Sequence, residues 1–214
     1  MGEALRATHR PIIFASASMG CWMSGPGERS ANLWRTTGDI DIGNRWQSIL
    51  SSGFDHNGKL SHAGADGWND PDDLLIGKSG MTADEDQTQM TLWAIMAAPL
   101  FVGLANNHMG AWTPAVKAIL MNREVIAVDQ DVSGIQGHLV LHRGPIEVWT
   151  KRLSDGTTAV GVFNLGEKHG RCGFAGRSYG SARSGTCAIS GARRFLEVSR
   201  ADSRDLSRYM VPCY

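Results

Sequence analysis

The sequence contains no apolar run that approaches the roughly 20 residues a membrane-spanning helix needs. Its first residues, MGEALRATHRP, lack the apolar core of a signal peptide. Basic and acidic residues balance, so the formal net charge is zero, and no excess of charge favours nucleic acid or an acidic membrane as a partner. We therefore predict no membrane span and no nucleic-acid partner.

Cysteine is scarce, and its spacing does not form a metal-binding pattern. The four cysteines show no Cys-x-x-Cys pair, which argues against a zinc site: Cys21, Cys172, Cys187 and Cys213. His138 and His142 lie in strand-like sequence, and we do not interpret them as a metal pair. We predict no metal and no cofactor, and the pairing of the last three cysteines stays open.

Lysine is absent from residues 170–214, which hold eight arginines and three acidic residues. Residues 1–169 therefore carry a net charge of −5, against +5 for this tail. The tail also lacks strand alternation and a sustained helical stripe. Such composition is typical of out-of-frame translation of a GC-rich gene, although a basic interaction tail is the alternative. We expect the segment after about Lys168 to have no stable structural counterpart in related proteins.

The first 134 residues instead show alternating strand and helix patterns. RPIIFAS (10–16) and PLFVG (99–103) are typical of buried strands, and KLSHAG (59–64) of a short one. DIGNRWQSILSSGF indicates a helix with Asp41 as its N-cap. ADEDQTQMTLWAIMAA and TPAVKAILMN indicate two more helices, the first stopped by Pro99. Alternation at this spacing predicts parallel α/β units.

A different pattern begins near Gly137. The stretch GHLVLHRGPIEVWTKRLSDGTTAVGVFNLG alternates apolar and polar residues and carries turn signals at 143–145 and 154–156. We therefore predict antiparallel strands, and a β module that follows the α/β part.

Polar clusters follow the predicted strands. They are Arg35 with Asp39, the run GWNDPDD (67–73), and the small-residue stretch ASASMGCW (15–22). Loops at the C-terminal ends of parallel barrel strands converge on one face, where active sites form. Tryptophan faces stack on sugars, and carboxylates with arginine hydrogen-bond their hydroxyls, so a sugar site is one interpretation. The alternatives are a surface ion pair at i, i+4 and an Asn-Asp-Pro-Asp turn.

Four separated motifs decide between these interpretations. LWRTTGDI, GWNDPDDLLIG, QTQMTLWAIMAAPLF and NREVIAVDQD occur in this order, and together they resemble family 27 of the glycoside hydrolases, the α-galactosidase (melibiase) family. The resemblance covers roughly residues 5 to 165. It implies an α/β fold with the C-terminal half of a (β/α)8 TIM barrel (strands 5–8, residues 1–134). It further implies the start of an antiparallel β-sandwich domain (135–169), before the atypical tail (170–214).

The resemblance also implies the chemistry. It makes Asp39 the acid/base of a retaining mechanism and Arg35 and Asp72 sugar-binding residues, with Asp73 and Trp68 beside them in the pocket. A neighbouring carboxylate about 5 Å away would raise the pKa of such an acid. The expected substrates are terminal α-D-galactosyl groups of oligosaccharides, galactomannans or glycolipids. Carbohydrate is thus the expected partner, in a secreted, periplasmic or lysosome-like location.

Three departures from the family pattern qualify this prediction. The nucleophile of the family ends the fourth barrel strand and is matched by no residue of this chain, so we expect an incomplete and inactive chain. The loop after the fifth strand has no glutamate in ASASMGCW, and Asp73 stands where many relatives carry methionine. An α-N-acetylgalactosaminidase, a β-L-arabinopyranosidase and a non-catalytic carbohydrate-binding remnant are the alternatives.

Overall fold

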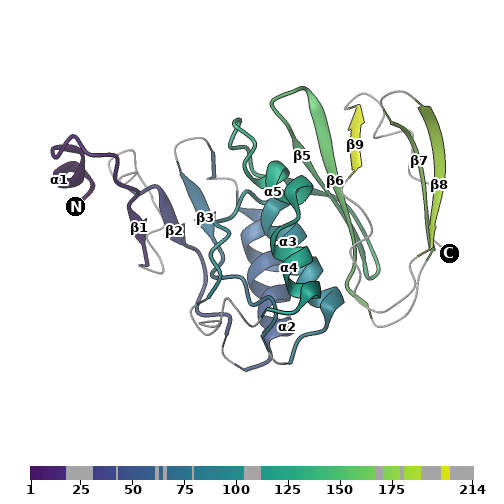
Figure 1. Cartoon of the computed structure of the whole chain (residues 1–214), viewed down its shortest axis with the longest axis horizontal. Helices are drawn as coiled ribbons and strands as arrows, with labels where there is room; N and C mark the ends of the chain where they lie inside the picture. The colour runs from purple at the N-terminus through teal and green to yellow at the C-terminus, as the bar shows by residue number, and fades with distance from the viewer. Residues whose placement is uncertain are drawn as a thin grey trace.

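The computed structural model places three parallel strands, a central group of helices and two antiparallel sheets side by side along its longest axis (Figure 1). It describes residues 1–17, 31–41, 43–60, 63–64, 67–78, 80–103 and 112–166, together with the backbone of strands 171–178, 181–188 and 199–202. No helix in these ranges has the length and apolar content needed to cross a membrane.

The parallel sheet has the order β1-β2-β3 and is formed by short strands: β1 (Ala15–Ser16), β2 (Leu33–Arg35) and β3 (Trp68–Asp70). A parallel bridge between Leu74 and Val102 adds a further pairing. The predicted parallel α/β arrangement is confirmed, whereas its membership of a half barrel stays a prediction.

Two predicted buried strands are shorter and more exposed than the sequence indicates. Only Ala15 and Ser16 of the segment 10–16 are in a strand, and Ile13 keeps 76% of its surface exposed. In the segment 99–103 only the bridge at Val102 forms, and Phe101 is 52% exposed. The predicted strand at 59–64 is wrong at Lys59, which ends a 3-10 helix, while residues 61–62 lie outside the described ranges. A continuous apolar run forms a buried strand only where other elements cover both faces of its sheet.

The helices lie between the sheets. They are α1 (Gly2–Arg6), α2 (Arg45–Ile49), which continues as a π-helix (Leu50–His56) and a 3-10 turn (Asn57–Lys59), α3 (Ala83–Ile95), α4 (Pro114–Leu120) and α5 (Arg123–Asp129). Helix α3 confirms its prediction, and Thr82 with Glu85 forms a capping box at its start. The predicted N-cap Asp41 is wrong, because Asn44 caps α2 by accepting from the Gln47 amide at 3.2 Å. Asp41 instead binds Lys78 and Arg45.

The predicted antiparallel strands are confirmed. One sheet has the order β4-β5-β6-β9, and its strands are β4 (His138–Arg143), β5 (Ile146–Arg152), β6 (Thr157–Asn164) and β9 (Ser199–Asp202). Strands β7 (Arg171–Ser178) and β8 (Ser181–Ala188) form a hairpin in which Cys172 lies opposite Cys187. Strands therefore form after residue 168, although the sequence there lacks strand alternation. The out-of-frame origin of the tail stays a hypothesis.

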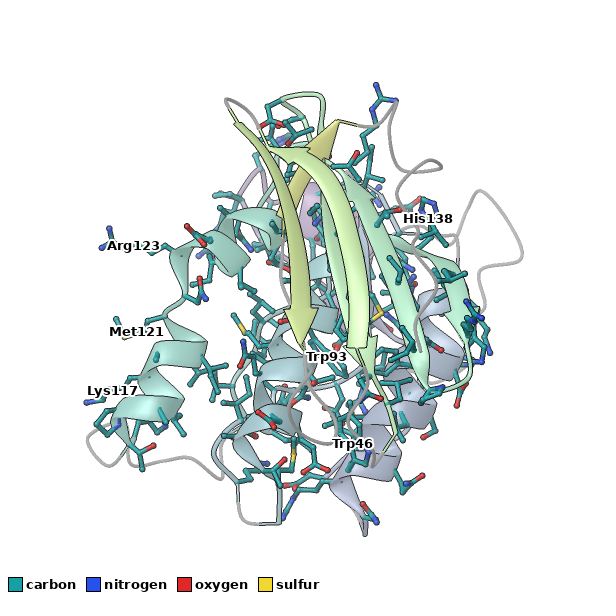
Figure 2. All side chains as sticks on the ribbon, turned by 90° about the vertical axis from the view of Figure 1, so that its right-hand side faces the viewer. Trp46, Trp93, Lys117, Met121, Arg123 and His138 are labelled. Carbon is teal, nitrogen blue, oxygen red and sulfur yellow. The ribbon has the colours of Figure 1, made fainter. Side chains whose placement is uncertain are left out.

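Helix α3 packs against both parts of the molecule, since it contacts α4 and α5 on one side and β5 and β6 on another. Trp93 of α3 lies in the interior beneath the antiparallel strands, whereas Lys117, Met121 and Arg123 project outward (Figure 2). Phe54 packs edge-on to Trp149 and Phe163, with ring centroids 5.9 and 5.1 Å apart. One continuous core therefore joins the α/β part to the β module.

A buried cation reinforces this junction. Lys151 of β5 is fully buried, and its Nζ donates to the carbonyl oxygens of Ala94 and Asp129, each at 3.3 Å. These carbonyls belong to the last turns of α3 and α5, where the helix dipole is negative. Burial lowers the pKa of Lys151 to about 8, and the nearby Asp129 and Asp131 partly oppose that shift. Lys151 thus ties the β module to two helix ends.

Candidate active site

Arg35 is the centre of a charged cluster at the end of β2. Its Nη2 donates to Asp72 Oδ2 at 3.0 Å and to Asp39 Oδ1 at 3.0 Å. The side chains of Arg35 and Asp72 are only 17% and 15% exposed, whereas that of Asp39 is 68% exposed. Three residues that the resemblance assigns to the site therefore lie together, and Asp39 is on the open side.

Strand pairing brings the two polar motifs together. Strands β2 and β3 run parallel, and Arg35 lies opposite Asp70 in their register. Both motifs therefore continue from the same end of the sheet, as neighbouring parallel strands require. Thr36 extends this pairing, because its amide donates to the Asp70 carbonyl at 3.0 Å.

Asp72 has an unusual backbone conformation. Its φ is +90°, a region that residues other than glycine rarely occupy and that costs of order 1–3 kcal/mol. The surrounding bonds hold it there: Asp72 Oδ2 accepts from the Ile40 amide at 2.9 Å, and Oδ1 accepts from the Asp73 amide at 2.8 Å. Strained residues that their surroundings fix in this way cluster at active sites.

Asp39 confirms the ion-pair interpretation of its spacing, whereas the sugar-site interpretation stays a prediction. It forms the i, i+4 ion pair with Arg35, and its exposure keeps its carboxyl accessible from outside. An ion pair of this exposure contributes little to stability, about 0 to 1 kcal/mol. The geometry therefore brings Asp39 into the cluster, and its role as an acid/base is a proposal.

Asp70 and Asp73 complete a group of close carboxyls. Burial raises the pKa of Asp70, although the hydrogen bond from the Asp72 amide and the charge of Arg35 oppose the shift. Burial also raises the pKa of Asp73, and the Asp72 carboxylate adds to this effect, while Lys78 opposes it. A cluster of acids with pKa values pushed upward is typical of sites that handle protons.

Lys78 is a polar neighbour of this cluster that the sequence did not reveal. Its side chain is 8% exposed, and its Nζ donates to Asp41 Oδ2 at 2.6 Å. Hydrogen bonds from Lys78 and Arg45 lower the pKa of Asp41. A Cβ atom at Gly103 would lie 3.2 Å from both Lys78 Nζ and Asp73 Oδ2, so the two charged groups flank the same backbone. A lone lysine in a glycine-containing loop carries no sequence signal for such a contact.

Trp68 does not bond to the Arg35 cluster among the described residues. Its indole N–H donates to the Gly134 carbonyl at 3.3 Å, in the connection between α5 and β4. Residues 18–22 of ASASMGCW, with Cys21, lie outside the described residues. Within the described ranges, no group of three histidine, cysteine or acidic residues is arranged to hold a metal ion.

Comparison with known proteins assigns the two parts of the chain to two family models. A model described as alpha galactosidase A matches residues 1–131, and one described as alpha galactosidase C-terminal beta sandwich domain matches residues 143–192. The second match extends past residue 169, so the expectation that nothing after Lys168 has a counterpart in the family is wrong up to residue 192.

Individual relatives agree with this assignment. The alpha-galactosidase of Cyamopsis tetragonoloba is 39% identical over 169 residues, which are 77% of this chain and 39% of that protein. The alpha-N-acetylgalactosaminidase of Gallus gallus is 37% identical over 177 residues, 77% of this chain and 42% of that protein. The chain thus spans about two-fifths of the length of these curated relatives.

A solved structure supports the fold. Alpha-galactosidase I from Mortierella vinacea superposes with a TM-score of 0.72 at 23% identity, and the match covers 94% of this chain and 62% of that one. Relatives of this kind imply a TIM barrel followed by a β sandwich. Since a family model covers more than half of the sequence, the chain belongs to the α-galactosidase (melibiase) family, family 27 of the glycoside hydrolases.

Proposed function

We propose that this chain carries the acid/base half of a retaining α-galactosidase site, for terminal α-D-galactosyl groups of oligosaccharides, galactomannans or glycolipids. The observation that carries the proposal is the Arg35 side chain, which is held by buried Asp72 and reaches exposed Asp39. Arginine donates in a fixed fork that suits vicinal hydroxyls and carboxylates. In this proposal the hydroxyl groups of a bound sugar replace the contact between Arg35 and Asp39. The Asp72 carboxylate continues to hold Arg35.

The proposed reaction is a double displacement. Asp39 gives a proton to the leaving oxygen while a second carboxylate attacks the anomeric carbon, and Asp39 then activates the water that releases the sugar. Covalent attack discharges the second carboxylate, so Asp39 changes from acid to base. Asp73, beside Asp72, forms a polar wall of the pocket, and Trp68 remains a candidate for stacking on the sugar face.

The second carboxylate is not Asp70 or Asp72 in this proposal. Asp70 Oδ1 accepts from the Asp72 amide at 2.9 Å, and Asp72 is bound to Arg35 and two amides. Both belong to the strand next to that of Asp39, whereas the attacking group must approach from the opposite side of the sugar. We therefore propose that the 214-residue chain alone hydrolyses no glycoside.

The test compares p-nitrophenyl α-galactoside hydrolysis by the purified chain and by a fusion that places the first four barrel strands of the Cyamopsis relative ahead of Met1. We expect turnover only in the fusion, and Asp39→Asn in the fusion should slow alkyl galactosides far more than dinitrophenyl galactosides, which need no proton. Equal loss with both leaving groups would remove Asp39 from this role. Activity of the chain alone that Asp39→Asn abolishes would place the second carboxylate within these residues.

An α-N-acetylgalactosaminidase is the second candidate, because the chicken relative is almost as similar as the plant one. The fusion should be assayed with p-nitrophenyl N-acetyl-α-galactosaminide and with the β-L-arabinopyranoside beside the galactoside. Preference for either alternative sugar would replace the galactosidase assignment. Binding of galactose without turnover of any of the three would favour a non-catalytic carbohydrate-binding remnant.

A further inference from the structure

Helix α3 carries a stripe of buried polar side chains that faces the loop after β3. Asp86, Gln89 and Trp93 are spaced at i, i+3 and i+7, which places them on one face of the helix. They are 5%, 0% and 0% exposed. Burying polar groups costs free energy unless each one is hydrogen-bonded, so a helix that only had to pack would carry apolar residues here.

The stripe bonds to the backbone of the loop in reverse sequence order. Trp93 Nε1 donates to the Asp72 carbonyl at 2.9 Å. Gln89 makes two bonds: its Nε2 donates to the Asp73 carbonyl at 3.2 Å, and its Oε1 accepts from the Leu75 amide at 2.8 Å. Asp86 Oδ2 accepts from the Gly77 amide at 3.0 Å. Three side chains of one helix therefore hold the main chain from 72 to 77.

The segment also packs into the core through Leu74, Leu75 and Ile76, but it is not part of a regular strand. Leu74 pairs with the 101–103 backbone, but β3 has already ended at Asp70. Asp72 and Gly77 both have positive φ, at +90° and +80°, so the chain bends away from any regular element. A strained backbone conformation persists only where several contacts fix it, and the hydrogen bonds from α3 are among those contacts here.

We propose that Gln89 and Trp93 are positioning residues, which hold the backbone at Asp72–Leu75 so that the Asp72 carboxylate keeps Arg35 in its sugar-binding orientation. Only the identity of the ligand, a sugar, depends on the proposed function. Gln89 acts at the two peptide groups that follow Asp72, and Trp93 acts at the carbonyl of Asp72 itself. Neither side chain reaches the sugar.

The test measures amide hydrogen exchange by NMR in the 214-residue chain, so it does not depend on catalytic activity. Gln89→Leu keeps the volume and removes both hydrogen bonds. The exchange rates of the Ile40 and Asp73 amides report directly on the position of the Asp72 carboxylate, since both amides donate to it. We expect them to exchange about tenfold faster, the effect of two lost bonds. The buried Val160 amide in β6 reports global stability, and Gln87→Leu on the exposed face of α3 is the matched control.

A carboxyl-specific signature separates positioning from general support of the fold. With aspartate labelled by ¹³C at Cγ, the Asp72 signal should move in Gln89→Leu and return partway in Gln89→Glu, which keeps an acceptor for the Leu75 amide. The proposal is overturned if the Asp72 signal does not move, or if Ile40 and Asp73 exchange faster only in proportion to Val160. Should Gln89→Leu fail to fold, Gln89→Glu and Trp93→Phe carry the same readouts, and unchanged Ile40 and Asp73 exchange in both would also overturn it.

Discussion

Arg35 and Lys151 are both largely buried cations, but they are satisfied in opposite ways. Lys151 is fully enclosed and donates to two main-chain carbonyls at helix ends. Arg35 is held by side-chain carboxylates, one of which, Asp39, is mostly exposed. In the proposed site a ligand replaces Asp39, whereas nothing reaches Lys151 without opening the core. We propose that exposure of one partner distinguishes a charge that binds a ligand from a charge that supports the fold.

Among the single substitutions, the largest effect should come from removing the enclosed cation. Lys151→Ala should lower the free energy of unfolding by about 3 kcal/mol, because it leaves a cavity and the buried Asp129 without its nearest positive charge. Urea denaturation of the chain measures this, with Arg152→Ala on the exposed side of the same strand as the control. A loss below about 1 kcal/mol would contradict the supporting role.

A pH series addresses two buried carboxyls, of which Asp129 lies at the same junction and Asp86 lies near the start of α3. Burial raises the pKa values of Asp86 and Asp129 to about 6, so the folded chain binds more protons than the unfolded chain between about pH 4 and pH 6. The stability these groups give is present below pH 4 and is lost as the pH rises through 6. A rise in pKa from 3.8 to about 6 is worth about 3 kcal/mol for each group, so we expect the free energy of unfolding to fall by several kcal/mol across this window.

Asp129→Asn should reduce that fall, and Asp55→Asn at an exposed site should not. The pKa of Lys151 is lowered instead, so the unfolded chain binds the extra proton between about pH 8 and pH 10.5. Stability should therefore rise again across that range. A profile without a minimum between pH 6 and pH 8 would show that the pKa values of Asp86, Asp129 and Lys151 are not shifted as described.

The site cation should matter less for stability. Arg35→Met should lower the free energy of unfolding by about 1 kcal/mol, since it loses ion pairs that solvent partly screens and leaves Asp72 with its two amide donors. Thermal melting followed by circular dichroism measures the change. A loss as large as that of Lys151→Ala would erase the distinction between the two cations.

The smallest effect should come from the exposed partner. Asp39→Asn should change the free energy of unfolding by less than about 0.5 kcal/mol, because its carboxyl is already in contact with water. The same melts compare it with Asp72→Asn, which disturbs three contacts and should cost more. If the two variants melted alike, Asp72 would not be the anchor of Arg35.

Local sequence signals predicted helix α3, because an acidic first turn, a run of buried residues and Pro99 agree with one another. They failed for Asp41, whose true partner Lys78 is 37 positions away. They predicted the strand β5 but not its burial, because residues 146 to 151 are all buried and do not alternate with exposed ones. A lysine in an alternating strand normally faces solvent, so the sequence did not indicate that helices α3 and α5 cover the face of β5 that carries Lys151.

The site was predicted in part from motifs and in part not at all. The Arg35 and Asp39 contact follows from their spacing, whereas the link to Asp72 required the family resemblance, since strand pairing over 37 residues is not local. Gln89 looked like an ordinary helix residue. Side chains that act on a distant backbone carry no pattern of their own, which is why the polar stripe of α3 emerges only in three dimensions.

The shared core around α3 has a consequence for synthesis of the chain. Residues 83–95 leave the ribosome before residues 146–163, yet α3 contacts β5 and β6 and shares one hydrophobic core with them. The apolar face of the helix therefore stays uncovered until the β module has been translated. During that interval the nascent α/β part exposes apolar surface of the kind that promotes aggregation, and a stop codon between the two parts would leave it without its last layer.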